Sequence, residues 1–244
     1  MTPTSPGLTY LATAQRLLER VATQEWPQLS AAADALVTAL SAGHTVHAFG
    51  TGHSHMLAEE LYYRAGGLVR VSPILFEGLM LHANARLSTS LERLPGLADA
   101  LLDNHAVAAG DVVFVASNSG SNAVTSEIVS ALRARGAVVI AITSITHATS
   151  SEARETEYPK LHELADIVID NGGVVGDAAV EIDGFAQRVS PTSTVVGAAI
   201  LNAIVAETVA RLVAAGIPPE VYTSSNTSGG DAANDRFAHV AGAV

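Results

Sequence analysis

The chain has 244 residues, of which 48% are hydrophobic and 15% charged, and it contains no cysteine. Its 13 Lys and Arg against 24 Asp and Glu give a net charge of −11. That charge repels nucleic acid and anionic lipid, so we expect neither nucleic acid nor membrane as a partner. The composition is too apolar for disorder, and the lack of cysteine excludes disulfides and thiolate catalysis.

The N-terminal residues show no basic segment followed by an apolar one, so we expect a cytoplasmic protein without a signal peptide. The longest nearly apolar segment, 195–206, falls short of the roughly 20 residues of a membrane span. Because the chain has so few charges, part of its apolar surface is expected to face another subunit, in a homodimer or higher oligomer.

Hydrophobic periodicity predicts the elements of an α/β fold. The expected strands are 45–49, 68–74, 111–116, 138–143 and 166–170. The expected helices are 8–41 with a break at Pro27, 55–64, 97–107, 123–135, and one that begins at Ser193 or Thr194 and ends near 215. We expect loops at 144–164 and 222–244.

The regular alternation of strand, loop and helix predicts a doubly wound parallel sheet of five strands. We divide the chain into an N-terminal helical arm (1–30), a central α/β domain (31–216) and a C-terminal tail (217–244). The tail is expected to contribute to a site or an interface. Ligands of such sheets bind at the carboxyl ends of the strands, which directs attention to 50–55, 74–82, 117–122 and 143–147.

Two of these loops carry small polar residues. The first is Gly50-Thr51-Gly52-His53-Ser54, and the second is Ser117-Asn118-Ser119-Gly120-Ser121-Asn122. Hydroxyls and amides at a helix N-terminus can bind a phosphate dianion without Lys or Arg, although a plain capped turn uses the same residue types. The first loop is not G-x-G-x-x-G and has no Walker A lysine, which favours a ligand smaller than a dinucleotide or a nucleoside triphosphate.

With these two loops the chain resembles the sugar isomerase (SIS) domain of phosphosugar isomerases and binding proteins, over about residues 30–216. The helical arm and the tail segment 224–234 resemble the branch that contains the N-acetylmuramic acid 6-phosphate etherases. The resemblance implies a phosphate held by the hydroxyls and amides of both loops. The implied phosphate ligands are Ser54, Ser117, Asn118, Ser119 and Asn122.

The resemblance also implies a catalytic glutamate on the helix after the first loop, where this chain carries Glu59 and Glu60. In the etherases and phosphoheptose isomerases the glutamate comes about one turn later, near Arg64. Either carboxylate could instead lie on a solvated helix face. Glu77 and His82 are candidate proton donors, and the apolar neighbours of Glu77 suggest a buried carboxyl whose pKa is raised, or a buried ion pair with an arginine.

Other residues of these loops and of the tail are expected to contact the sugar. They are Gly52, His53, His55, Ser121 and Asn226. His53 and His55 alternate along the chain without an accompanying ligand motif, so we expect no metal site and no cofactor.

Three functions fit this pattern. The first is a lyase that removes the C2 proton of an N-acetylhexosamine 6-phosphate and eliminates the C3 substituent, as a dehydratase or an etherase-like enzyme. The second is an aldose–ketose phosphosugar isomerase of the phosphoheptose type. The third is a non-catalytic phosphosugar sensor. We rank elimination slightly ahead of isomerisation, because both need a base and the candidates include a separate acid.

Overall fold

The computed structural model describes residues 5–240 and contains a central sheet of five parallel strands. The strand order is β2-β1-β3-β4-β5. The strands are β1 (Val46–Gly50), β2 (Val71–Ile74), β3 (Val112–Ala116), β4 (Val138–Thr143) and β5 (Ile167–Asp170). The predicted doubly wound sheet is thus confirmed. After β1 the chain forms β2 on one side of β1, and then β3 on the other side. At such a reversal of strand order, a crevice opens between the loops that follow the two neighbouring strands, here β1 and β3.

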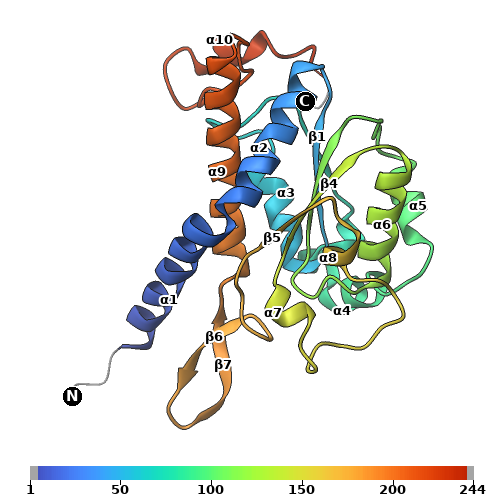
Figure 1. Cartoon of the computed structure of the whole chain (residues 1–244), viewed down its shortest axis with the longest axis vertical. Coiled ribbons are helices and arrows are strands. Elements are labelled where there is room, and N and C mark those ends of the chain that lie inside the picture. Colours follow the sequence, from blue (N-terminus) through green and yellow to red (C-terminus); the bar gives the residue numbers. More distant parts are fainter. Residues whose placement is uncertain (1–4, 241–244) are drawn as a thin grey trace.

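Helices cover both faces of the sheet (Figure 1). One face is covered by α2 (Trp26–Ser41), α3 (His55–Leu61) and α9 (Ser193–Ala214), and the other by α5 (Leu97–Leu102), α6 (Ala123–Ala134) and α8 (Leu161–Leu164). By length and composition α9 could cross a membrane, but Val196, Ile200 and Ile204 on its inner face are buried in the core. The helix therefore packs as the core helix of a domain.

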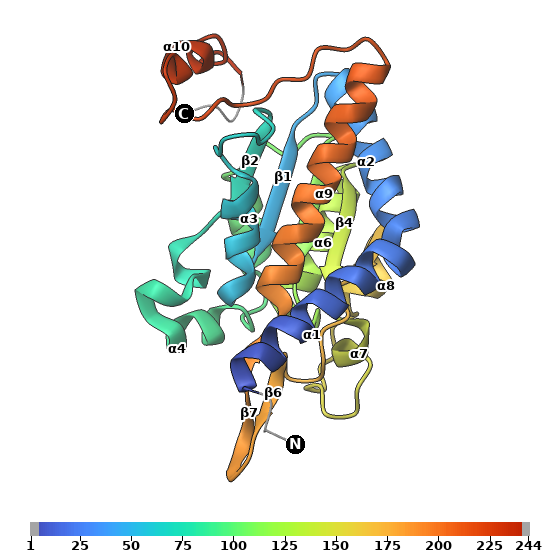
Figure 2. The ribbon, with the colours of Figure 1, turned by 90° about the vertical axis from the view of Figure 1, so that its left-hand side faces the viewer.

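The N-terminal arm is a helical segment that changes direction between α1 and α2 (Figure 2). A π-helical turn (Val21–Glu25) joins α1 (Pro6–Arg20) to α2, and Pro27 lies in the first turn of α2, where its missing N–H costs no helical bond. The expected break at Pro27 is therefore a π turn. Leu8 and Leu11 of α1 are each 62% exposed. The homodimer stays a prediction.

The two segments expected to be loops contain short helices. They are α7 (Ile145–Ala148), α8 within the first segment, and α10 (Gly230–Asp235) in the second. The helix α4 (Leu81–Leu91) and an antiparallel hairpin, β6 (Ala178–Ile182) and β7 (Phe185–Pro191), were also missed. These elements have too few buried residues to give a clear hydrophobic period.

The C-terminal tail lies at the amino ends of the strands. Val69, just before β2, donates its backbone N–H to Glu220 O at 3.0 Å, and Leu68 forms a bridge with Val221. Phe237 and Val240 pack there against Val69 and Tyr222. Figures 1 and 2 show α10 at the end of the molecule opposite to α7 and the hairpin. The tail and the loops after the strands thus occupy opposite edges of the sheet.

Candidate functional site

A hollow of about 280 Å³ lies at the carboxyl ends of the strands. It is lined by Thr51, His53, Ser54, Glu92, Ser117, Asn118, Ser119, Asn122, His147, Gly176, Asp177 and Ser193. The described residues that line it include no Lys or Arg. The donors that it can offer to an anion are hydroxyls, amides, backbone N–H groups and two histidine rings.

The first loop turns sharply from β1 into α3. A Cβ atom on Gly50 would lie 2.5 Å from the backbone carbonyl of Ser54, so a larger residue would displace the turn. The turn exposes His53 and part of Ser54 to the hollow. Thr51 is buried, and its hydroxyl donates to Glu92 Oε2 at 2.9 Å.

The second loop is shaped by contacts from α8 and from the segment that follows β5. Gly120 has a φ of +60°, and a Cβ there would lie 2.8 Å from Leu161 Cβ. Asn118 Oδ1 accepts a hydrogen bond from Asn171 Nδ2 at 2.7 Å, and Asn171 Oδ1 accepts one from Gly173 N at 2.8 Å. Because Asn118 Oδ1 already accepts from Asn171, the side-chain NH₂ group of Asn118 is the part that can donate to a ligand.

Asn122 precedes the first residue of α6, so the N-terminal end of this 12-residue helix lies at the hollow. The partial positive charge of a helix N-terminus attracts anions, and hydroxyls beside it complete the binding group. Ser119 and Asn122 are partly exposed there, as a ligand contact requires. This end of the hollow is therefore suited to a phosphate.

Glu92 connects the two loops. Its carboxylate accepts from Thr51 in the first loop, and its backbone carbonyl accepts from Val124 N, in the first turn of α6, at 3.2 Å. The side chain has no Arg, Lys or His ion-pair partner within residues 5–240. A carboxylate held by a neutral hydroxyl keeps an oxygen available to take a proton.

Asp177 closes the hollow from the side of α9. It has a φ of +66°, and its Oδ1 accepts from Thr192 N at 3.1 Å and Ser193 N at 3.0 Å. Its Oδ2 accepts from Ser193 Oγ at 2.5 Å. Asp177 therefore occupies the N-terminus of α9, and its charge is compensated within the protein.

Residues 9–144 match the model of the SIS domain. This is more than half of the chain. The chain belongs to the SIS domain family.

Three bacterial proteins match this chain over most of its length. The UPF0309 protein of Geobacillus thermodenitrificans is 42% identical over 228 residues, covering 93% of this chain and 92% of that protein. A UPF0309 protein of Listeria innocua is 40% identical over 225 residues, covering 92% and 91%. One of Brucella canis is 45% identical over 202 residues, covering 83% and 82%.

Among solved structures, a phosphoheptose isomerase from Francisella tularensis is similar with a TM-score of 0.56 and 16% identity. The match covers 85% of this chain and 98% of that one. A phosphoheptose isomerase from Neisseria gonorrhoeae follows with a TM-score of 0.51 and 17% identity, covering 82% and 94%. At this level of identity the likeness concerns the fold.

The structure brings together the residues that the sequence assigned to the phosphate. Ser54, Ser117, Asn118, Ser119 and Asn122 all line the hollow, and so does His53. Their roles stay predictions. The loops at 50–55, 117–122 and 143–147 contribute to the lining, whereas 74–82 does not.

The candidate bases on α3 lie outside the lining. Glu59 has a side chain 52% exposed and pairs with His55 Nε2 at 3.5 Å. Glu60 forms an ion pair with Arg64 and accepts from Asn202 Nδ2 at 2.7 Å. Glu60 therefore connects α3 to α9.

The candidate acids after β2 lie on the surface. Glu77 is exposed in a short 3-10 turn (Glu77–Leu79), so its expected burial is wrong. The chain turns outward after β2, so the Glu77 side chain faces solvent, whereas the side chain of its apolar neighbour Leu79 is buried. No ion pair of Glu77 with an arginine occurs in the part of the chain that the structure describes. His82 is exposed, with its ring 6.1 Å from that of His55.

The remaining sugar-contact candidates are dispersed. The His55 ring is buried and hydrogen-bonds to Gly52 O, and neither residue belongs to the lining. Ser121 lines a neighbouring cavity beside Arg93 and Arg154. Asn226 is in the tail, at the opposite edge of the sheet, so it does not reach the hollow of its own chain.

Three ionisable residues of the hollow were missed from the sequence: Glu92, His147 and Asp177. His147 falls in a loop that the strand pattern had pointed to, so it could have been found. Glu92 ends a polar helix, and Asp177 lies before a hairpin. Neither position carries a local sequence signal for a site.

Proposed function

We propose that this protein binds a sugar phosphate in the hollow and removes the C2 proton of its open-chain form. The observation that carries the proposal is the position of Glu92. Within residues 5–240 this carboxylate has no cationic partner, and it lies between the two polar loops that line the hollow. The phosphate would lie against Ser54, Ser119, the Asn118 amide and the N-terminus of α6. The carbonyl end of the sugar would then lie near Glu92, His147 and Asp177.

The proposed substrate is an N-acetylhexosamine 6-phosphate and the proposed reaction is elimination at C3. Glu92 takes the proton from C2, and the electron pair of the C–H bond forms an enolate with the C1 carbonyl. The enolate re-forms the carbonyl, a C2–C3 double bond forms, and the C3–O bond breaks. The proton now on Glu92 is available to the leaving oxygen. An acetamido group at C2 prevents simple conversion to a ketose, and the resemblance to the etherase branch supports an amino sugar.

The test is incubation of the protein in deuterated water with N-acetylglucosamine 6-phosphate, N-acetylmuramic acid 6-phosphate and sedoheptulose 7-phosphate, followed by NMR. We expect a vinylic proton signal from one of the N-acetylhexosamine phosphates. Deuterium at C1 of a ketose product, or at C2 of an aldose formed from sedoheptulose 7-phosphate, would show isomerisation and contradict elimination. If the protein bound these sugar phosphates but exchanged no proton in any of the three, it would be a sensor, and the proposed enzymatic activity would be wrong.

A further inference from the structure

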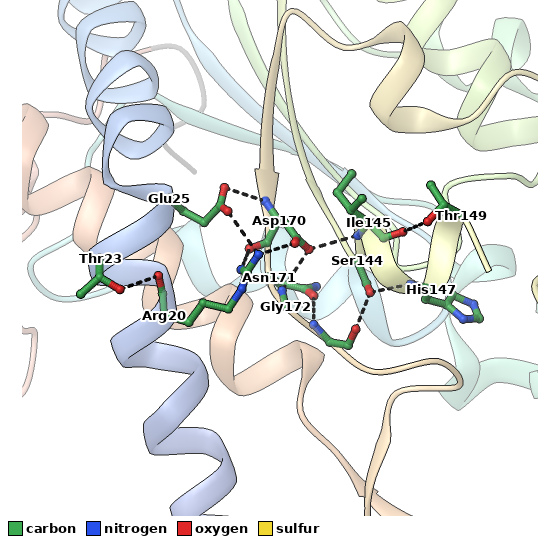
Figure 3. Close-up of polar contacts among 11 residues, drawn as sticks. Arg20, Thr23, Glu25, Ser144, Ile145, His147, Thr149, Asp170, Asn171 and Gly172 are labelled. Carbon is green, nitrogen blue, oxygen red and sulfur yellow. Dashed lines mark hydrogen bonds and ion pairs between the residues drawn. The ribbon is translucent and has the colours of Figure 1, made fainter.

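His147 is a residue of the hollow to which the sequence analysis assigned no role. It belongs to α7, which begins directly after β4. Ser144 caps this helix: its Oγ accepts from His147 N at 3.0 Å and donates to Gly173 O at 2.6 Å. The backbone N–H of His147 is therefore connected through Ser144 to the segment that follows β5 (Figure 3).

The contacts of the ring define its tautomer. Gly176 N lies 3.2 Å from His147 Nδ1, and a backbone N–H can only donate. Nδ1 is therefore the acceptor, and the neutral ring carries its proton on Nε2. Nε2 has no hydrogen-bond partner within residues 5–240. The imidazole is thus a neutral N–H donor in a hollow that has no Lys or Arg among its lining residues.

The N-terminal arm fixes the start of α7 from the far side. Asp170, the last residue of β5, accepts from Ile145 N at 3.0 Å. Its other carboxylate oxygen lies 2.6 Å from Arg20 Nη2, and Glu25 accepts from Asp170 N at 3.2 Å. Arg20 precedes the π turn and Glu25 ends it. Figure 3 shows this network from the arm to His147. A donor held in this way undergoes little reorganisation when charge develops on a ligand.

We propose that His147 Nε2–H donates a hydrogen bond to the carbonyl oxygen of the bound sugar and stabilises the enolate oxyanion that forms when the C2 proton is removed. This rests on the proposed function. No proton leaves the imidazole, because Nδ1 is occupied as an acceptor and loss of the Nε2 proton would give an imidazolate. The group polarises the carbonyl as a neutral imidazole.

The test compares His147→Ala and His147→Gln in the C2 deuterium-exchange assay. We expect His147→Ala to lower kcat for exchange by about 10²- to 10³-fold, as loss of one oxyanion donor does, with KM within a few-fold. His147→Gln keeps an amide N–H donor and is expected to recover at least about 10-fold of that loss. Equal kcat in wild type and His147→Ala would overturn the proposal. So would a loss confined to KM, or a failure of Gln to exceed Ala.

Two controls separate this outcome from failure of the proposed function. Wild-type protein that shows no exchange with any of the three sugar phosphates would refute the proposed function before His147 is considered. His239→Gln changes an exposed histidine near the C-terminus, far from the hollow, and is expected to leave exchange unchanged. Thermal unfolding of both His147 variants checks that their fold is intact.

Discussion

The two edges of the sheet contain similar residues in different states. At the amino edge, Asp111 is buried and saturated: its carboxylate accepts from Thr45 N at 3.0 Å and Ala108 N at 2.8 Å and contacts His47 at 3.1 Å. At the carboxyl edge, Glu92 has one hydroxyl donor and faces a hollow.

The small cavities at the two edges differ in the same way. One at the amino edge, of about 140 Å³, is lined by leucines and prolines together with Arg70 and Glu220. These two charges are paired with each other at 2.7 Å. In the carboxyl-edge hollow, Thr51 and Ser193 already donate to Glu92 and Asp177, whereas Ser54, Ser119, the Asn118 amide and His147 Nε2 donate to no group within residues 5–240. Polar groups that satisfy one another stabilise the fold, whereas those left available indicate a site.

The largest effect is expected at Glu92. Glu92→Gln keeps the size of the side chain but removes the base, so we expect C2 exchange to fall by about 10³-fold or more with sugar phosphate binding within a few-fold. Exchange measured by NMR and binding measured by calorimetry check this. Glu181→Gln, on the exposed hairpin, is the matched control. Exchange that survives in Glu92→Gln and disappears in Glu59→Gln would place the base on α3, as the sequence predicted.

The next effect concerns stability at the amino edge. Asp111→Ala leaves His47 and two backbone N–H groups buried without their acceptor, so we expect the free energy of unfolding to fall by about 3 kcal/mol. Urea unfolding measures it. Exchange per folded molecule should stay within a few-fold, because Asp111 is at the opposite edge. If folded Asp111→Ala lost C2 exchange, the amino edge would contribute to the reaction, and the proposed distinction between the two edges would be wrong.

The same carboxyl has a definite pH dependence. Burial would raise the pKa of Asp111, but the N–H groups of Ala108 and Thr45 and the contact with His47 outweigh burial and lower it. A lowered pKa means that its contribution to stability is present above the ordinary value of 3.8 and is lost as the pH falls below it. Asp111→Asn should flatten that part of the acid unfolding curve.

A smaller effect, on ligand affinity, is expected from substitution of Asn171, whose Nδ2 donates a hydrogen bond to Asn118 Oδ1. Asn171→Ala frees the Asn118 side chain to rotate, so we expect sugar phosphate affinity to fall by about 5- to 10-fold, corresponding to one hydrogen bond. Calorimetry with N-acetylglucosamine 6-phosphate measures the change. An unchanged affinity in a variant that unfolds at the wild-type temperature would show that Asn118 does not contact the ligand.

The smallest effect is expected at His105, near the amino edge. Burial and the neighbouring His47 lower the pKa of His105 below its ordinary value of 6.5. The unfolded chain then binds the proton more readily, so stability falls as the pH drops from 6.5 to the lowered pKa. His105→Gln should reduce the slope of unfolding free energy against pH in that window, and His239→Gln should not. Equal slopes in wild type and His105→Gln would contradict this assignment.

The core of the fold could be predicted because its pattern is local. The buried run 112–116 and the polar loop that follows define one strand and one loop of the candidate site within a dozen residues. Short exposed elements such as α4, α7 and the hairpin β6–β7 could not be predicted in this way. They bury too little to leave a period, and contacts with distant segments hold them. Glu77 shows the same limit, because its apolar neighbours indicated burial but the turn placed it outside.

The sequence by itself determined the doubly wound sheet and the two polar loops, because strand periodicity and turn residues act over neighbouring positions. Only the tertiary structure decided which charged groups join those loops. Thr51 meets Glu92 across 41 residues, and Gly176 fixes the His147 ring across 29. The tail, which the sequence led us to expect at a site or an interface, lies at the far edge, beside Leu68. Contacts of this range depend on how the chain packs in three dimensions, and no spacing along the sequence encodes them.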